Sequence, residues 1–155
     1  MPPELKARLK NDLNVSMKAR DELTTATLRM ALTAITTEEV AGASARELTD
    51  DEVLRVLVRE AKKRREAAQA YDDAQRDELA ARERAEGTVL ARYLPAQLSD
   101  DELVELVRDA VAEAGASEPR QMGAVMKLVT PRVAGKADGR RVSDEVRRQL
   151  SAGGS

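Results

Sequence analysis

The chain has 155 residues, of which 42% are hydrophobic and 35% are charged, and its formal net charge is only −2. That length is enough for one domain of ordinary size or for two small ones. The sequence contains no His, Cys, Phe or Trp and only two Tyr. The absence of His and Cys excludes Ser-His-Asp triads, Cys nucleophiles, disulfides and Cys/His zinc sites. So few aromatic residues also argue against a groove that stacks single-stranded bases.

Apolar spacing and capping residues predict four helices in the first part of the chain. Asp21 is expected to cap the second helix, which ends before Gly42, and a capping box at residues 49–52 starts the third. The polar stretch 72–77 is expected to turn, and Gly87 is a weak position in the fourth helix. The side chains expected to face inward are Leu5, Leu9, Leu13 and Met17, then Leu23, Leu28, Met30, Leu32, Ala34 and Ile35, then Leu54, Leu57, Ala61, Ala68 and Tyr71, and finally Leu79, Glu86, Leu90 and Tyr93.

A proline marks a boundary between two predicted domains. Pro95 lies in the segment LPAQL, and the residue before a proline is pushed out of the helical conformation. A second capping box, at residues 99–102, follows directly. We therefore expect an N-terminal helical domain over residues 1–95, a small C-terminal domain over 96–150, and a flexible tail over 151–155.

Three shorter helices are predicted in the C-terminal domain. Ser117 is expected to cap the middle one, with Pro119 in its first turn, and Pro131 is expected to end or kink it. Residues 135–139 form a predicted tight turn before the last helix. No alternation typical of strands competes anywhere, so the predicted fold class is all-α, with four helices followed by three. The expected core residues are Leu103, Leu106, Val107, Ala110 and Val111, then Met122, Val125, Met126 and Val129, and then Val142, Val146 and Leu150.

The near-zero net charge hides a strong segregation in the C-terminal domain. Residues 99–118 hold one basic and seven acidic residues, a net charge of −6, whereas residues 119–150 hold eight basic and three acidic residues, a net charge of +5. A basic helix pair joined by a glycine turn suits phosphate, because glycine allows close approach and a helix N-terminus attracts anions. The alternative is a solvated face that pairs with the acidic helix. The candidate nucleic-acid-binding residues are Lys127, Arg132, Gly135, Lys136 and Arg140.

A second basic cluster, which we call the residue 59–65 cluster, lies in the third predicted helix. Its members are either a nucleic-acid stripe or the water-facing side of an amphipathic helix, and neighbouring glutamates at helical spacing (Glu52, Glu60 and Glu66) favour the second interpretation. The basic residues of this cluster are Arg59, Lys62, Lys63, Arg64 and Arg65.

No catalytic constellation is visible. A di-iron Glu-x-x-His pattern requires His, calcium loops and Walker loops are absent, and the serines are explained as helix caps. We therefore predict no catalytic residue, no cofactor and no metal site. No run of 18 apolar residues predicts a membrane span, and the first residues lack the apolar segment of a signal peptide, so we expect a cytoplasmic location.

Several short motifs occur in a recognisable order. They are Leu28-Arg29-Met30, RELTDDE at residues 46–52, YLPAQLS at residues 93–99, and MGAVM at residues 122–126, followed by Pro131 and by GKADG at residues 135–139. In this order the chain resembles the GatB/YqeY-domain family over roughly residues 4–150. The resemblance implies an all-helical protein related to the helical and tail domains of the GatB component of the tRNA-dependent amidotransferase, with a small three-helix part at the C-terminus.

The amidotransferase converts Glu-tRNA(Gln) or Asp-tRNA(Asn) into the amidated form. Its tail is taken to contact the tRNA, and its chemistry occurs in a cradle domain that this sequence does not contain. The resemblance therefore implies a non-catalytic module that contacts tRNA through Lys127, Gly135, Lys136 and Arg140. Two alternatives are an accessory subunit whose third and fourth helices bind a partner protein, and a carbon–nitrogen ligase with glutamine as amido donor that acts only within a larger complex. Gly123, in the same motif, also has a packing interpretation, in which it lets a neighbouring helix approach closely.

Overall fold

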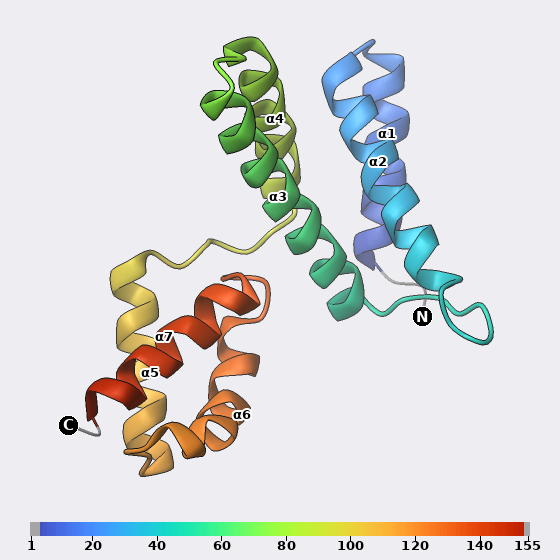
Figure 1. The fold of residues 1–155 in the computed structure, drawn as a ribbon. Coiled ribbons are helices and arrows are strands. Elements are labelled where there is room, and N and C mark those ends of the chain that lie inside the picture. The colour runs from blue at the N-terminus through green and yellow to red at the C-terminus, as the bar shows by residue number, and fades with distance from the viewer. Residues whose placement is uncertain (1–3, 154–155) are drawn as a thin grey trace. The chain divides into compact units, whose positions relative to one another are not determined.

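The computed structural model describes residues 4–153, and these residues form seven α-helices and one short 3-10 helix, with no strand (Figure 1). The all-α fold class is therefore confirmed. The described residues form two compact units that divide between Leu94 and Pro95. The first unit holds α1 to α4, and the second holds α5 to α7.

Two helical hairpins make up the first unit. The helices α1 (Glu4–Lys18) and α2 (Glu22–Glu39) lie side by side, and α3 (Asp50–Asp73) packs along α4 (Asp77–Ala91) (Figure 1). The starts of α2 and α3 follow the predicted caps. Asp21 accepts a hydrogen bond from the backbone N–H of Thr24 at 3.1 Å, and Thr49 forms its capping box with Glu52.

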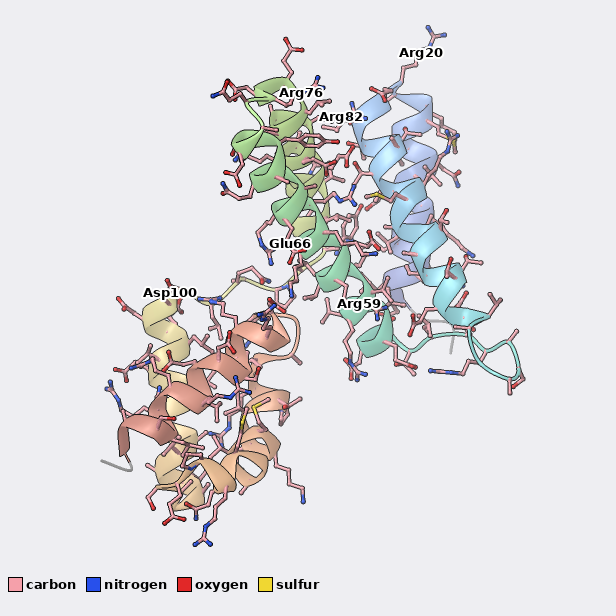
Figure 2. All side chains as sticks on the ribbon, in the orientation of Figure 1. Arg20, Arg59, Glu66, Arg76, Arg82 and Asp100 are labelled. Atoms are coloured by element: carbon pink, nitrogen blue, oxygen red, sulfur yellow. The ribbon has the colours of Figure 1, made fainter. Side chains whose placement is uncertain are left out.

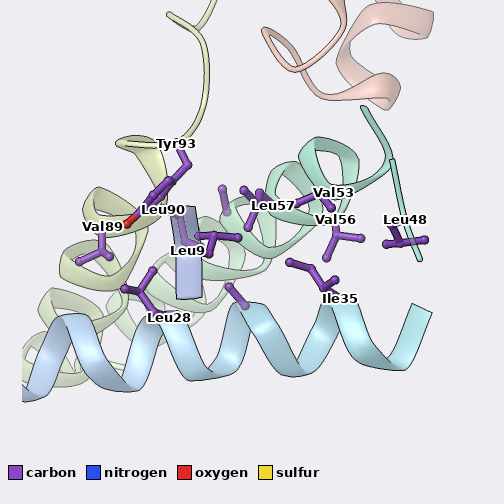
Figure 3. Packing of buried hydrophobic residues seen from close by; sticks show 12 residues of the cluster. Leu9, Leu28, Ile35, Leu48, Val53, Val56, Leu57, Val89, Leu90 and Tyr93 are labelled. Atoms are coloured by element: carbon purple, nitrogen blue, oxygen red, sulfur yellow. The ribbon is translucent and has the colours of Figure 1, made fainter. Parts of the chain in front are cut away.

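The core of the first unit consists of aliphatic side chains with one aromatic ring at its edge, Tyr93 (Figure 3). Two predicted core residues are at the surface instead: Leu79 is 42% exposed and Met17 is 39% exposed. Leu79 is exposed because the buried face of α4 runs through its neighbour Ala80 and through Val89 and Leu90. The residues at the centre of the cluster are Leu9, Leu28, Ala31, Ile35, Val53, Val56, Leu57, Ala61, Val89 and Leu90, of which Ala31, Val53, Val56 and Val89 were not predicted.

Glu39, the last residue of α2, holds the exposed loop over residues 40–47 in place. Its carboxylate accepts hydrogen bonds from Lys6 Nζ at 2.8 and 2.9 Å and from the backbone N–H of Leu48 at 3.1 Å. The hydrogen bond from Lys6 lowers the pKa of Glu39 below its ordinary value, and the Leu48 amide contributes in the same direction. Because Leu48 itself is buried, this contact fixes both ends of the loop.

The second unit is a three-helix domain. It consists of α5 (Asp100–Ala114), the 3-10 helix η1 (Pro119–Gln121), α6 (Met122–Val133) and α7 (Gly139–Gly153). The predicted capping box at the start of α5 is present, with Glu102 N–H donating to Ser99 Oγ at 3.1 Å. The core residues are Leu103, Val107, Ala110, Val125, Val129, Val133, Ala137, Val142, Val146 and Leu150.

Two local expectations for this unit, those for Ser117 and for residues 151–153, are corrected. Ser117 does not cap a helix, because the chain first forms η1, whose N-cap is Glu118 and whose first residue is Pro119. Pro131 lies inside α6, which ends two residues later at Val133. Residues 151–153, expected in a loose tail, continue α7, since Ala152 favours helix and the first glycine comes only at 153. The rest of the predicted tail, residues 154–155, lies outside the described residues.

We predict that Glu39→Gln lowers the free energy of unfolding by about 1 kcal/mol at pH 7, because it removes an ion pair and weakens a loop anchor. The pKa of Glu39 is depressed in the folded state, so its contribution is present above the unfolded pKa and is lost as the pH falls through the folded pKa. The difference between the variant and the parent should therefore disappear under acid conditions. Urea unfolding at neutral and acidic pH measures it, and Glu38→Gln, at an exposed pair with Arg59, is the control.

Two glycines should respond in opposite ways to alanine. A Cβ built on Gly87 would lie 3.8 Å from Arg64 Cβ, an ordinary contact, so Gly87→Ala should stabilise the first unit by about 0.5–1 kcal/mol. Gly115 ends α5 with a φ of 63°, so Gly115→Ala should destabilise the second unit by about 1–2 kcal/mol. Thermal unfolding of both variants checks the signs, and a destabilising Gly87→Ala would contradict the packing described for α3 and α4.

Candidate nucleic-acid interface

The turn between α6 and α7 carries the predicted glycine and lysine. Gly135 has a φ of 73°, a conformation that favours glycine, and the backbone N–H of Lys136 donates to the carbonyl of Val133 at 2.8 Å. The next residue, Ala137, is buried in the core of the second unit. The turn is therefore anchored from within, while the Lys136 side chain remains exposed.

A clasp formed by Gln97, Leu98 and Arg141 holds the turn from its other side. Gln97 Nε2 donates to the carbonyl of Gly135 at 2.8 Å, and the backbone N–H of Leu98 donates to the carbonyl of Lys136 at 2.9 Å. Arg141 Nη1 donates in turn to the carbonyl of Leu98 at 3.0 Å. Sequence reasoning missed Gln97 and Arg141 as residues that position the turn, because their partners are 38 and 43 residues away and leave no local signal.

Five of the eight basic residues between 119 and 150 are in ion pairs. Two of these pairs join α5 to the rest of the unit: Arg132 contacts Glu113 at 2.5 Å, and Arg141 contacts Asp100, labelled in Figure 2, at 2.8 Å. The candidate residue Arg132 is therefore neutralised by the acidic helix. The remaining pairs are local, namely Arg120–Glu118, Arg147–Asp144 and Arg148–Glu145.

The other three basic residues, which we call the unpaired cations, are Lys127, Lys136 and Arg140. Within residues 4–153, none of these side chains forms an ion pair, and all three residues are exposed. Lys127 lies on α6, Lys136 in the turn and Arg140 at the start of α7. Three of the five predicted residues thus carry a positive charge that is in no ion pair within the described residues.

Asp138 occupies part of the start of α7. Its carboxylate accepts a hydrogen bond from the backbone N–H of Arg140 at 3.3 Å, and its carbonyl accepts from Val142 N–H at 3.0 Å. The expectation that the first amides of the last helix are open to an anion is therefore modified, since Asp138 already caps one of them. An anion near this turn would bind chiefly to side-chain cations.

The residue 59–65 cluster on α3 shows a contrasting arrangement. Arg59, labelled in Figure 2, pairs with Glu38 on α2 at 3.2 Å, and Lys63 pairs with Glu60 at 3.2 Å. Arg64 is 19% exposed and lies 3.3 Å from two carboxylates of α4, those of Glu83 and Glu86. Lys62 pairs with Glu66 at 3.9 Å. Arg59 and Arg64 therefore join α3 to α2 and to α4, while Lys62 and Lys63 pair with glutamates of α3 itself, as the amphipathic interpretation predicts.

Gly123 does not have the packing role expected of it. Among the described residues, no side chain and no backbone beyond its own helical turn comes within 4 Å of a Cβ built on Gly123. The expectation that Gly123 lets a neighbouring helix approach is therefore wrong. Met122 and Met126, its neighbours in the motif, do pack against the core.

In the part of the chain that the structure describes, no group of three or more acidic side chains could hold a metal ion. No described helix is long and apolar enough to cross a membrane.

Comparison with known proteins places this arrangement in a family. The model of the YqeY-like protein family matches residues 6–150, which include the motifs around Pro95 and around the turn. The chain belongs to the YqeY-like protein family. The resemblance found in the sequence is therefore confirmed over nearly the whole chain.

Two relatives of this YqeY-like chain come from yeasts. An uncharacterised protein of Schizosaccharomyces pombe is 35% identical over 99 residues, which cover 63% of this chain and 78% of the relative. The altered inheritance of mitochondria protein 41 of Clavispora lusitaniae, a protein named as mitochondrial, is 28% identical over 128 residues, which cover 81% of this chain and 74% of the relative. Both similarities extend over most of the relative's length.

We predict that Gln97→Ala loosens the turn of this YqeY-like chain without unfolding the second unit. The variant loses the hydrogen bonds from Gln97 Nε2 to the carbonyls of Pro95 and Gly135, so the neighbouring bond between Leu98 and Lys136 should open more often. Hydrogen exchange at the Leu98 amide should become several-fold faster. Gln69→Ala, which removes an exposed side-chain bond to Asp73 on α3, should leave that amide unchanged.

Proposed function

We propose that this protein is a non-catalytic RNA-binding module that contacts tRNA, or acts on tRNA together with a processing partner, through the unpaired cations of its second unit. Family membership supports the comparison with the tail of the amidotransferase. The decisive observation is that the side chains of Lys127, Lys136 and Arg140 form no ion pair among the described residues, whereas those of the other five basic residues of the segment do.

The proposed binding mode uses the phosphate backbone and not the bases. Both tyrosines of the chain, Tyr71 and Tyr93, belong to the first unit, and Tyr93 is buried there with its hydroxyl donating to Asp12 at 2.5 Å. Burial, together with this hydrogen bond, raises the pKa of Tyr93 to about 12, so the hydroxyl stays protonated at neutral pH. No aromatic ring of the second unit is available to stack on a base, which favours recognition of charge and shape.

The alternative of an accessory protein-interaction subunit has less support. This alternative assigned the partner surface to α3 and α4. The apolar residues of these two helices pack on each other and on α1 and α2. Among their described residues, Leu79 is the one large apolar side chain that is exposed. Carbon–nitrogen ligase activity with glutamine as amido donor stays a proposal for a larger complex only. The predicted cytoplasmic location also stays a prediction, beside the mitochondrial name of the Clavispora relative.

The test compares two triple variants with the same loss of charge. The first replaces Lys127, Lys136 and Arg140 by Gln, and the second replaces Arg108, Arg147 and Arg148, each of which pairs with an acidic residue three positions earlier. Filter binding of unfractionated tRNA is measured across salt concentrations. Three phosphate contacts give a log–log salt slope of about −2 to −3, so Kd for the parent should rise roughly 20- to 40-fold between 50 and 200 mM salt.

The first triple variant should bind at least about tenfold more weakly at low salt and should lose most of this slope, because each phosphate contact contributes about one unit to it. The second should bind within about threefold of the parent. Equal loss in both variants would show that binding follows only overall charge, and no binding by the parent at low salt would contradict the proposed function.

A further inference from the structure

Four glycines between residues 115 and 139 fall into two groups. Gly115 and Gly135 have positive φ values of 63° and 73°, which account for the choice of glycine at these turns. Gly123 and Gly139 have neither a positive φ nor any atom within 4 Å of an added Cβ, apart from their immediate backbone surroundings. Gly139 is the first residue of α7, whereas Gly123 is the second residue of α6 and directly follows the helical turn of η1, so alanine is more favourable than glycine at position 123. Nothing in the described chain therefore requires glycine at position 123.

The unexplained glycine shares a helix face with an unpaired cation. Gly123 and Lys127 are four residues apart on α6, so they lie on the same side of the helix, one turn from each other. Both are exposed, and the buried residues of α6 (Val125, Val129 and Val133) mark its opposite side. We call the side that bears Gly123 and Lys127 the outer face of α6.

The charge around this face complements an anion. Residues 119–137 contain no Asp or Glu, in a chain in which 35% of the residues are charged. A phosphate group at the outer face would therefore meet Lys127 without repulsion from any acidic side chain of α6 itself. A hydrogen at position 123 in place of a side chain would allow the phosphate and its ribose to approach the helix backbone directly.

We propose that the outer face of α6 is the surface on which the RNA phosphodiester backbone lies, with Gly123 as the point of closest approach and Lys127 as the phosphate ligand one turn further on. This inference rests on the proposed function. It assigns to RNA binding a residue, Gly123, that the sequence analysis had explained by helix packing. An acidic protein segment would satisfy the same charge, so the test includes an arm that separates it from RNA.

The experiment adds bulk at position 123 without changing charge. Gly123→Ala should raise the midpoint of thermal unfolding by about 1–4 °C, because alanine favours the helix and its methyl group meets no other atom among the described residues, yet it should weaken tRNA binding about two- to fivefold. Gly123→Leu should keep the helical circular dichroism spectrum and weaken binding at least tenfold. Ala112→Leu, which places the same side chain at an exposed position of α5, should bind tRNA like the parent.

The outcomes separate this inference from the proposed function. If both Gly123 variants bind tRNA within twofold of the parent while the Lys127, Lys136 and Arg140 triple variant loses binding, the outer face is not the contact and only this inference fails. If the parent does not bind tRNA, both fail. A poly-glutamate competitor should displace tRNA only weakly. The parent and Gly123→Leu should bind poly-glutamate equally, although they bind tRNA with different affinities. Strong displacement by poly-glutamate, together with weaker binding of poly-glutamate to Gly123→Leu, would overturn the assignment to RNA. Because Gly123→Ala is expected to be more stable than the parent, its loss of binding could not be attributed to unfolding.

Discussion

A core built almost without aromatic residues constrains the rest of this protein. Small aliphatic side chains reach only a short distance from the helix backbone. The helices are therefore also joined by ion pairs along the edges where they meet. Arg64 on α3 lies 3.3 Å from both Glu83 and Glu86 on α4, and Arg82, labelled in Figure 2, joins Glu86 to Glu22 on α2 at 3.1 Å. Such pairs occupy cations that would otherwise form a positive surface. The cost of desolvation is small for the exposed pair of Arg82 with Glu22, but it is larger for Arg64 and Glu83, which are mostly buried.

The same use of charge explains the polarity of the second unit. The acidic helix α5 provides the counterions that join it to its neighbours, through Glu113 to Arg132 on α6 and through Asp100 to Arg141 on α7. The two interpretations of the basic segment, a face paired with the acidic helix and a phosphate site, therefore apply to different residues. Arg132 and Arg141 pair with the acidic helix, as the first interpretation predicts. The phosphate-site interpretation still applies to the unpaired cations.

The features that could be predicted from the sequence are those determined within a few residues. The capping boxes at Thr49 and Ser99 depend on a partner three positions away, and both are present. The ion pairs and the clasp depend on which helix faces meet, and the spacing of Gln97 and Gly135 in the sequence carries no signal of that. Periodicity also left the rotation of α3 uncertain by about one residue, which is why Val53 and Val56 were missed.

The motifs that relate this chain to its family can be divided by what folding requires of each position. Val125 and Ala137 are buried, Gly135 has a positive φ, and Asp138 caps α7, so the fold itself accounts for these residues. Gly123, Lys136 and Gly139 receive no such account: two are glycines facing open space, and one is an exposed lysine with no ion pair among the described residues. Side chains that pack or cap are needed whether or not a ligand binds. The positions that folding leaves unexplained are uncharged or basic, are exposed and lie beside the other unpaired cations. Such positions suit an anionic ligand that approaches the backbone closely, which is why the RNA contact is sought on α6 and the following turn and not on the basic residues of α3.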